Sequence, residues 1–183
     1  MINRQIVTSA TLAFILSGCA MLSSRVEIPK WYLKLPVKKG YVYAVGTEKG
    51  DKIENAVSEA TKVAAEKLGS QMEMEIEANA KRAQEEVNDI AAVNSFNTTF
   101  KTIMAKSLSD WTVHKQDIVP AGKQDGKSMY QAFVVIEWNE TAAQERVLEQ
   151  LKADEKLYQQ FRSTELLNDL EKDVAEYRKR RGY

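Results

Sequence analysis

The feature that most constrains this chain is its single cysteine, Cys19. With one cysteine in 183 residues, no intrachain disulfide can form, so the hydrophobic core alone must hold the fold together. Cys19 also ends an apolar segment in which the run from Ile6 to Leu16 carries no charge and follows Arg4. This run is too short to cross a bilayer, which takes about 20 apolar residues. Its order of basic, apolar and small residues is that of a secretory signal peptide, so we predict that residues 1–18 are removed.

The expected cleavage point is formed by Leu16, Ser17, Gly18 and Cys19. Small residues let a peptidase take an extended backbone into a narrow groove, and the Cys19 sulfur can be joined to a diacylglycerol. The tetrapeptide resembles the lipobox of bacterial lipoproteins, which implies recognition through residues 16–18 and a triacylated Cys19. An ordinary signal peptide with an incidental cysteine is the alternative. Ala20 follows where lipoproteins kept in the inner membrane commonly carry aspartate, so an outer-membrane location is expected.

The full sequence has 26 basic and 26 acidic residues, and Arg4 is the one charged residue among residues 1–18. The chain that remains after cleavage is therefore nearly balanced in charge. It therefore offers no bulk electrostatic attraction to nucleic acid. No second apolar run of spanning length follows the signal, so acyl chains on Cys19 are expected to hold the protein to the membrane, facing the periplasm. We divide the rest into a tether at 19–30, an α+β domain at 31–140 and a helical segment at 141–183.

The first elements of that domain follow from local patterns. Tyr41–Val45 is aromatic and β-branched and ends at Gly46, which predicts a strand. Asp51 and Glu54 have the spacing of a capping box, and Gly69 is a plausible helix stop, so a helix is expected between them. Its apolar face is spaced by three and four residues: Ile53, Ala56, Val57, Ala60, Val63, Ala64 and Leu68.

Residues 71–80 alternate between apolar and polar side chains, which predicts a strand with one wet face. A helix is the rival interpretation, because glutamate, methionine and alanine all favour it. Residues 82–108 are expected to be helical, with a break or bend near 94–99, where helix formers are scarce. The buried side of this helix is predicted to include Val93, Phe96, Phe100, Ile103, Met104 and Leu108.

Two strand-like runs follow, Trp111–Val119 and Met129–Trp138, with turn residues between them. The second is the most hydrophobic stretch after the signal, so it is expected to be central. From Glu140 onward the pattern is helical, with a cap or kink at Ser163-Thr164. One seam holds Val147, Leu151, Tyr158 and Phe161. A second, of Leu167, Leu170, Val174 and Tyr177, could dock on its own domain or serve self-association. These elements predict a single α+β domain in the order β-α-β-α-β-β-α, with a mixed sheet backed by helices and a C-terminal helical tail.

The sequence contains no recognisable catalytic machinery. His114 is the only histidine, so a zinc site is not expected. No Gly-x-Ser-x-Gly elbow accompanies His114, and phosphate loops and dinucleotide fingerprints are absent. Carboxylates are plentiful, but no pair stands out as a general acid and base. We therefore expect neither a cofactor nor an enzymatic activity.

Several segments together resemble the Lpp-twenty family of bacterial outer-membrane lipoproteins. They are the lipobox at residues 16–19, Pro29 with Trp31, the strand end Tyr43–Gly46, and the alanine-spaced helix Ala56, Ala60, Ala64 and Leu68. The chain departs from the family at two positions. Ala65 stands where the family usually has a basic residue, and Gly69 stands where it usually has alanine. The resemblance implies a small envelope domain without catalytic residues that associates with itself or with partners. One branch builds a disc around the flagellar motor.

Two functions are therefore expected from different classes. The first is a lipid-anchored structural or scaffolding lipoprotein that forms homo-oligomers, including in a flagellar disc under the outer membrane. The alternative is a non-catalytic periplasmic binding module that regulates a peptidoglycan or envelope-assembly enzyme. Large assemblies of the soluble chain would favour the first, and a monomer with one saturable partner would favour the second.

Overall fold

The computed structural model describes residues 26–182. Residues 1–25 and Tyr183 are not described, so the predicted signal peptide, the tetrapeptide at 16–19 and most of the tether lie outside the described residues. The elements run in the order η1 (Lys30–Leu33), β1 (Val42–Gly50), α1 (Ile53–Glu86), α2 (Ile90–Ser107), η2 (Leu108–Asp110), β2 (Thr112–Gln124), β3 (Lys127–Trp138), α3 (Glu140–Ala153), α4 (Glu155–Phe161) and α5 (Glu165–Arg181). The predicted single α+β domain ending in a helix is confirmed.

The sheet has three strands in the order β1-β3-β2, and both pairings are antiparallel. β3 is central, as its hydrophobicity predicted. Asp125 and Gly126 both have positive φ and form the tight turn of the β2–β3 hairpin. The expectation of a mixed sheet is wrong, because the fourth predicted strand does not exist and β1 and β2 each pair antiparallel with β3.

The predicted strand at residues 71–80 is instead the middle of α1, which runs for 34 residues. Leu68 and Met72 continue the buried face at helical spacing, whereas Met74 is exposed. The helix propensity of glutamate, methionine and alanine therefore outweighs the two-residue alternation. Gly69 does not stop the helix but lies inside the continuous α1, where glycine costs roughly 1 kcal/mol relative to alanine.

The two ends of α1 also differ from expectation. The capping box is not formed: Lys52 is the N-cap without a side-chain bond, and Asp51 accepts a hydrogen bond from Asn55 instead. The break between the helices lies before Ile90, where the Asp89 carboxylate accepts hydrogen bonds from two amides of α2. No break occurs at 94–99, where the Thr98 hydroxyl bonds to the Asn94 carbonyl within the continuous helix.

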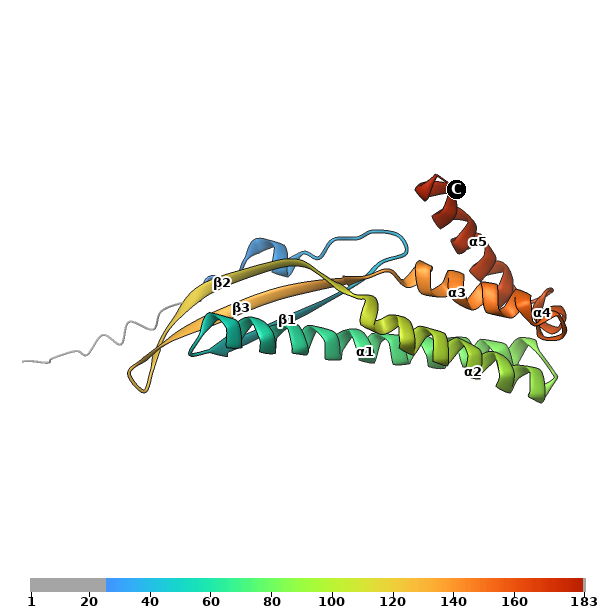
Figure 1. Ribbon diagram of the computed structural model, residues 1–183, viewed down its shortest axis with the longest axis horizontal. Coiled ribbons are helices and arrows are strands. Elements are labelled where there is room, and N and C mark those ends of the chain that lie inside the picture. Colours follow the sequence, from blue (N-terminus) through green and yellow to red (C-terminus); the bar gives the residue numbers. More distant parts are fainter. Residues whose placement is uncertain (1–25, 183) are drawn as a thin grey trace, which may run out of the picture.

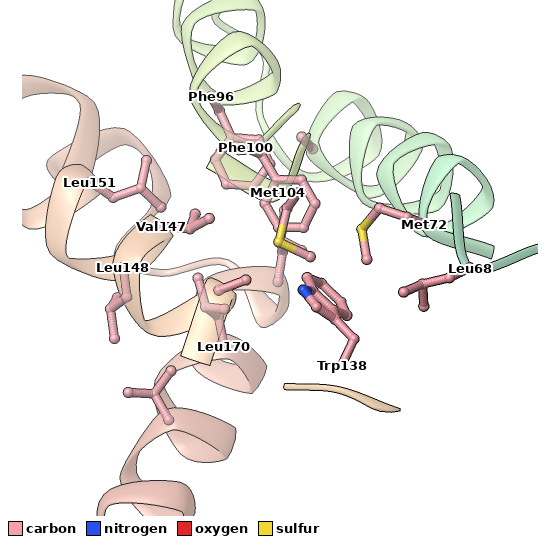
Figure 2. Close-up of a cluster of buried hydrophobic side chains, with 14 of the residues drawn as sticks. Leu68, Met72, Phe96, Phe100, Met104, Trp138, Val147, Leu148, Leu151 and Leu170 are labelled. Atoms are coloured by element: carbon pink, nitrogen blue, oxygen red, sulfur yellow. The ribbon is translucent and has the colours of Figure 1, made fainter. Parts of the chain in front are cut away.

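Part of the core lies between the sheet and α1, and the rest lies among the helices beyond the end of the sheet (Figure 1). Fully buried alanines at 56, 60 and 64 let α1 lie close against the sheet. Trp138, at the end of β3, sits among Leu68, Met72 and Met104 (Figure 2). Its indole nitrogen donates a hydrogen bond of 2.6 Å to the Ser107 carbonyl. This bond ties the central strand to the end of α2.

The opposite face of the sheet is covered by the N-terminal segment. The Tyr32 ring packs edge-on against Phe133, with centroids 5.0 Å apart. The Trp31 indole donates a 3.5 Å hydrogen bond to Asp117 on β2. The prediction that these two aromatics pin the start of the chain to the core is confirmed. Helix α1 therefore lies on one side of the sheet and η1 on the other (Figure 1).

Candidate functional site

The C-terminal seam is a predicted interaction surface that falls within the described residues. Leu167, Leu170, Val174 and Tyr177 are all buried, because α5 folds back and packs against α3. Asn139, which caps α3, also donates a 2.9 Å hydrogen bond to the Tyr177 hydroxyl. In this structure the seam docks on its own domain, and Leu170, which is 8% exposed, also borders the groove described below.

The predicted helix cap in this region is confirmed. The Thr164 hydroxyl accepts a hydrogen bond from the Leu167 amide and begins α5. At the other end, four basic residues occupy the last turn and Gly182 terminates the helix in a left-handed conformation. Cations in this position complement the helix dipole, as expected.

The surface feature that sequence reasoning missed is a groove among α1, α2, α3 and α5. Its cavity volume is about 360 Å³. The apolar lining consists of Ala78, Phe96, Phe100, Leu166 and Leu170. The polar lining consists of Glu75, Asn79, Arg82, Gln144, Asp169 and Asp173. The groove thus combines two phenylalanines with a ring of charged and amide groups. We call it the acidic groove.

The polar groups of the acidic groove are connected in pairs. Arg82 forms an ion pair of 2.9 Å with Asp169 and a longer one of 3.6 Å with Glu86. The hydrogen bond to Asp169 raises the pKa of Arg82. Gln144 donates a long, 3.4 Å hydrogen bond to Glu75. The lining holds three carboxylates and one cation, so its own charge is negative, although Asp169 is paired with Arg82 and Asp173 with Lys39, which lies outside the lining.

Glu140 lies behind the groove, in the first turn of α3. Burial raises its pKa most, and a hydrogen bond to Glu75 together with the charges of Glu75 and Asp173 adds to the effect, to about 8. The raised pKa favours the protonated form of Glu140, which can donate a hydrogen bond to the Glu75 carboxylate. The hydrogen bond between these two carboxyl groups joins α3 to α1.

His114 occupies the opposite face of the sheet and belongs to a different cluster. Its Nδ1 lies 3.2 Å from the Glu137 carboxylate, which also accepts a 3.1 Å hydrogen bond from the Tyr43 hydroxyl. Burial, followed by this bond, raises the pKa of Tyr43. The Glu137 carboxylate thereby joins one residue from each of the three strands. The cluster therefore links side chains of all three strands on one face of the sheet.

Within residues 26–182, no group of three or more acidic, histidine or cysteine side chains is arranged to hold a metal ion. None of the helices in that same part of the chain is long and apolar enough to span a membrane. Comparisons with protein-family models, with curated proteins and with solved structures gave no significant match.

The acidic groove could not be predicted while residues 71–80 were taken for a strand. Glu75, Ala78 and Asn79 line it because they share one side of a helix with Arg82. The signal that could have revealed this is the spacing of three and four residues between 75, 78, 79 and 82, which places them on one helical face.

Proposed function

We propose that this chain is a lipid-anchored lipoprotein of the outer membrane that works as a structural scaffold by contacting other copies of itself. The observation that carries the proposal is the tetrapeptide ending in Cys19. The described body is compatible with such an anchor, because its N-terminal segment is fastened to one face of the sheet through Tyr32 and Trp31. Helix α1, which supplies part of the lining of the acidic groove, lies on the other side of the sheet (Figure 1).

The surfaces available for self-association differ from those first expected. The seam on α5 is buried, and the free edge of β2 is a poor template. Its register shifts twice, between Val113 and Lys115 and between Pro120 and Lys123, and bulges and proline disfavour edge pairing. The acidic groove and the basic last turn of α5 are complementary in charge. Head-to-tail contacts between such surfaces can build rings or filaments, and the resemblance to the Lpp-twenty family suggests a flagellar disc as the setting.

The anchor is tested by Cys19→Ser in the full chain. The expected product is an uncleaved, unlipidated precursor that leaves the outer-membrane fraction after a salt wash, whereas Ser23→Ala, in the tether, keeps normal processing. Retention of the Cys19→Ser protein in the washed membrane would refute the anchor.

The scaffold is tested by light scattering over a concentration series, using the chain from Ala20 onward. Large assemblies that shrink with Glu75→Gln, but not with Glu77→Gln, would support head-to-tail contact through the groove. Glu77 is the matched control because it is exposed on the same helix but does not line the groove.

A binding module that regulates a peptidoglycan or envelope-assembly enzyme is the second candidate. The acidic groove favours it, because an apolar floor with a charged rim suits a basic, amphipathic segment of a partner protein. A persistent monomer that binds one partner saturably, with binding weakened by Glu75→Gln, would favour this candidate over the scaffold.

A further inference from the structure

The segment before β1 exposes large apolar side chains to an unusual degree. Val37 is 99% exposed, Leu33 is 74% exposed and Ile28 is 50% exposed. Scattered single hydrophobic residues on a surface need no explanation. Three exposed apolar side chains within ten residues, on the segment before the first strand, form a cluster.

Cations are interspersed with these side chains. Lys30, Lys34 and Lys38 are exposed, and Glu27 is the one acid between residues 26 and 41. Lys39 does not belong to this set, because it forms ion pairs with Asp173 and Glu176 on α5. We call residues 28–38 the lysine-rich segment. It is locally basic in a chain whose net charge is zero.

The packing of η1 fixes the direction in which the segment faces. Tyr32 is held against Phe133 and Trp31 against Asp117, so the aromatic side chains point to the sheet. The neighbouring Leu33 is left facing solvent. The lysine-rich segment begins on the face of the sheet opposite α1 (Figure 1). Its apolar and cationic side chains are exposed, and the Lys38 ammonium lies 3.5 Å from the centroid of the Tyr41 ring.

From this arrangement we propose that the lysine-rich segment binds the surface of a bilayer that contains anionic phospholipids. Leu33 and Val37 enter the interface between headgroups and acyl chains, and Lys30, Lys34 and Lys38 contact the phosphates. This inference rests on the proposed lipid anchor, which would hold the segment near the membrane, since about 14 residues from Cys19 to Leu33 span at most ~50 Å. Acylation and a basic patch together make a two-part attachment. Binding through this segment then determines which face of the folded domain is oriented toward the membrane.

The test uses the chain from Ala20 onward, which keeps every described element and carries no acyl chain. We expect it to sediment with vesicles of phosphatidylethanolamine and phosphatidylglycerol but not with vesicles of phosphatidylcholine alone. Lys30→Gln/Lys34→Gln/Lys38→Gln should weaken binding on the order of 100-fold, since each lysine contributes about fivefold. Leu33→Ser/Val37→Ser should weaken it at least about tenfold. The control Lys62→Gln/Lys67→Gln/Lys101→Gln removes the same charge from exposed positions on α1 and α2 and should bind as the parent does.

A second measurement reports orientation directly. The chain from Ala20 contains no cysteine, so Val37→Cys can carry a single environment-sensitive fluorophore. Its emission should shift to the blue on the anionic vesicles, and a label at Ile90→Cys, at an exposed position that begins α2, should not respond.

Three outcomes would overturn the inference. They are no binding to the anionic vesicles, equal responses of the two labels, or a loss of self-association in the Leu33→Ser/Val37→Ser variant with unchanged vesicle binding. The third would show that the segment contacts another copy instead of lipid. None of them bears on acylation of Cys19, because this chain lacks that residue, so failure here is distinct from failure of the proposed anchor.

Discussion

The backbone of Gly46 in β1 lies directly against Ala60 in α1, with no room between them for a side chain. A Cβ atom at Gly46 would collide with the Ala60 carbonyl oxygen and lie 2.7 Å from the backbone nitrogen of Ala64. The buried alanine face of α1 and this glycine together set how closely the helix approaches the sheet. A side chain at position 46 could fit only if α1 moved away from β1.

We therefore predict that Gly46→Ala lowers the free energy of unfolding by at least about 3 kcal/mol or prevents folding, because the clash is with backbone atoms. Gly69→Ala is the control. Its Cβ would meet only a Leu108 methyl at 3.9 Å, inside the continuous α1, so the change should stabilise by roughly 0.5–1 kcal/mol through helix propensity. Urea denaturation of the chain from Ala20 measures both. Equal effects of the two substitutions would contradict the close contact.

Trp138 provides a second prediction about the core. Trp138→Phe removes the indole donor of a 2.6 Å hydrogen bond to the Ser107 carbonyl and leaves a void in a fully buried site. We expect a loss of about 2–4 kcal/mol, from the unpaired acceptor and the cavity combined. Trp111→Phe, at a partly exposed position, should cost less than about 1 kcal/mol in the same denaturation assay. A similar cost at both positions would argue against a special role for the bond.

Much of this fold could be predicted from the sequence because its strands carry strong local signals. Tyr41–Val45 and Met129–Trp138 are β-branched and aromatic, and the turn chemistry before Met129 defined the hairpin. The cap at Thr164 was likewise readable from residue type. In each case the local preference and the tertiary packing agree.

The errors arose where the pattern and the propensity disagreed. Alternation over residues 71–80 suggested a strand, but this stretch belongs to a helix. Met72 is the one residue of the stretch that is buried, and Met74 is exposed. The seam on α5 could not be assigned from spacing, because an apolar helix face looks the same whether it meets its own core or another chain. The acidic groove depends on four helices meeting in space, which no local pattern encodes.

The pKa of Glu140 gives a prediction about pH. The folded value is raised from 4.5 to about 8, so between these values the folded chain binds one proton more than the unfolded chain at this site. The contribution of Glu140 to the free energy of unfolding is therefore complete below about pH 4.5 and falls as pH rises to about 8, by at most about 1.4 kcal/mol for each pH unit. Glu140→Gln, which keeps a neutral donor beside Glu75, should flatten this dependence.

Denaturant unfolding at a series of pH values from 5 to 9 tests this expectation. The control is Glu155→Gln, an exposed carboxylate in the first turn of α4, which should leave the slope of stability against pH as it is in the parent. If the parent and the Glu140→Gln protein lose stability equally over this range, a titration of Glu140 is not responsible for the dependence.

The last prediction separates a core position from a contact between copies. Leu167 is 1% exposed, so Leu167→Ala should lower the free energy of unfolding by about 2–5 kcal/mol, through lost burial and a cavity between α5 and α3. If the residue instead served a contact between copies, the substitution would change the assembly state and leave the unfolding of the isolated chain almost unaltered. Ile90→Ala, at an exposed position on α2, is the control and should change stability by no more than about 0.5 kcal/mol. Denaturation at a concentration low enough to exclude assembly, with light scattering on the same samples, distinguishes the two roles.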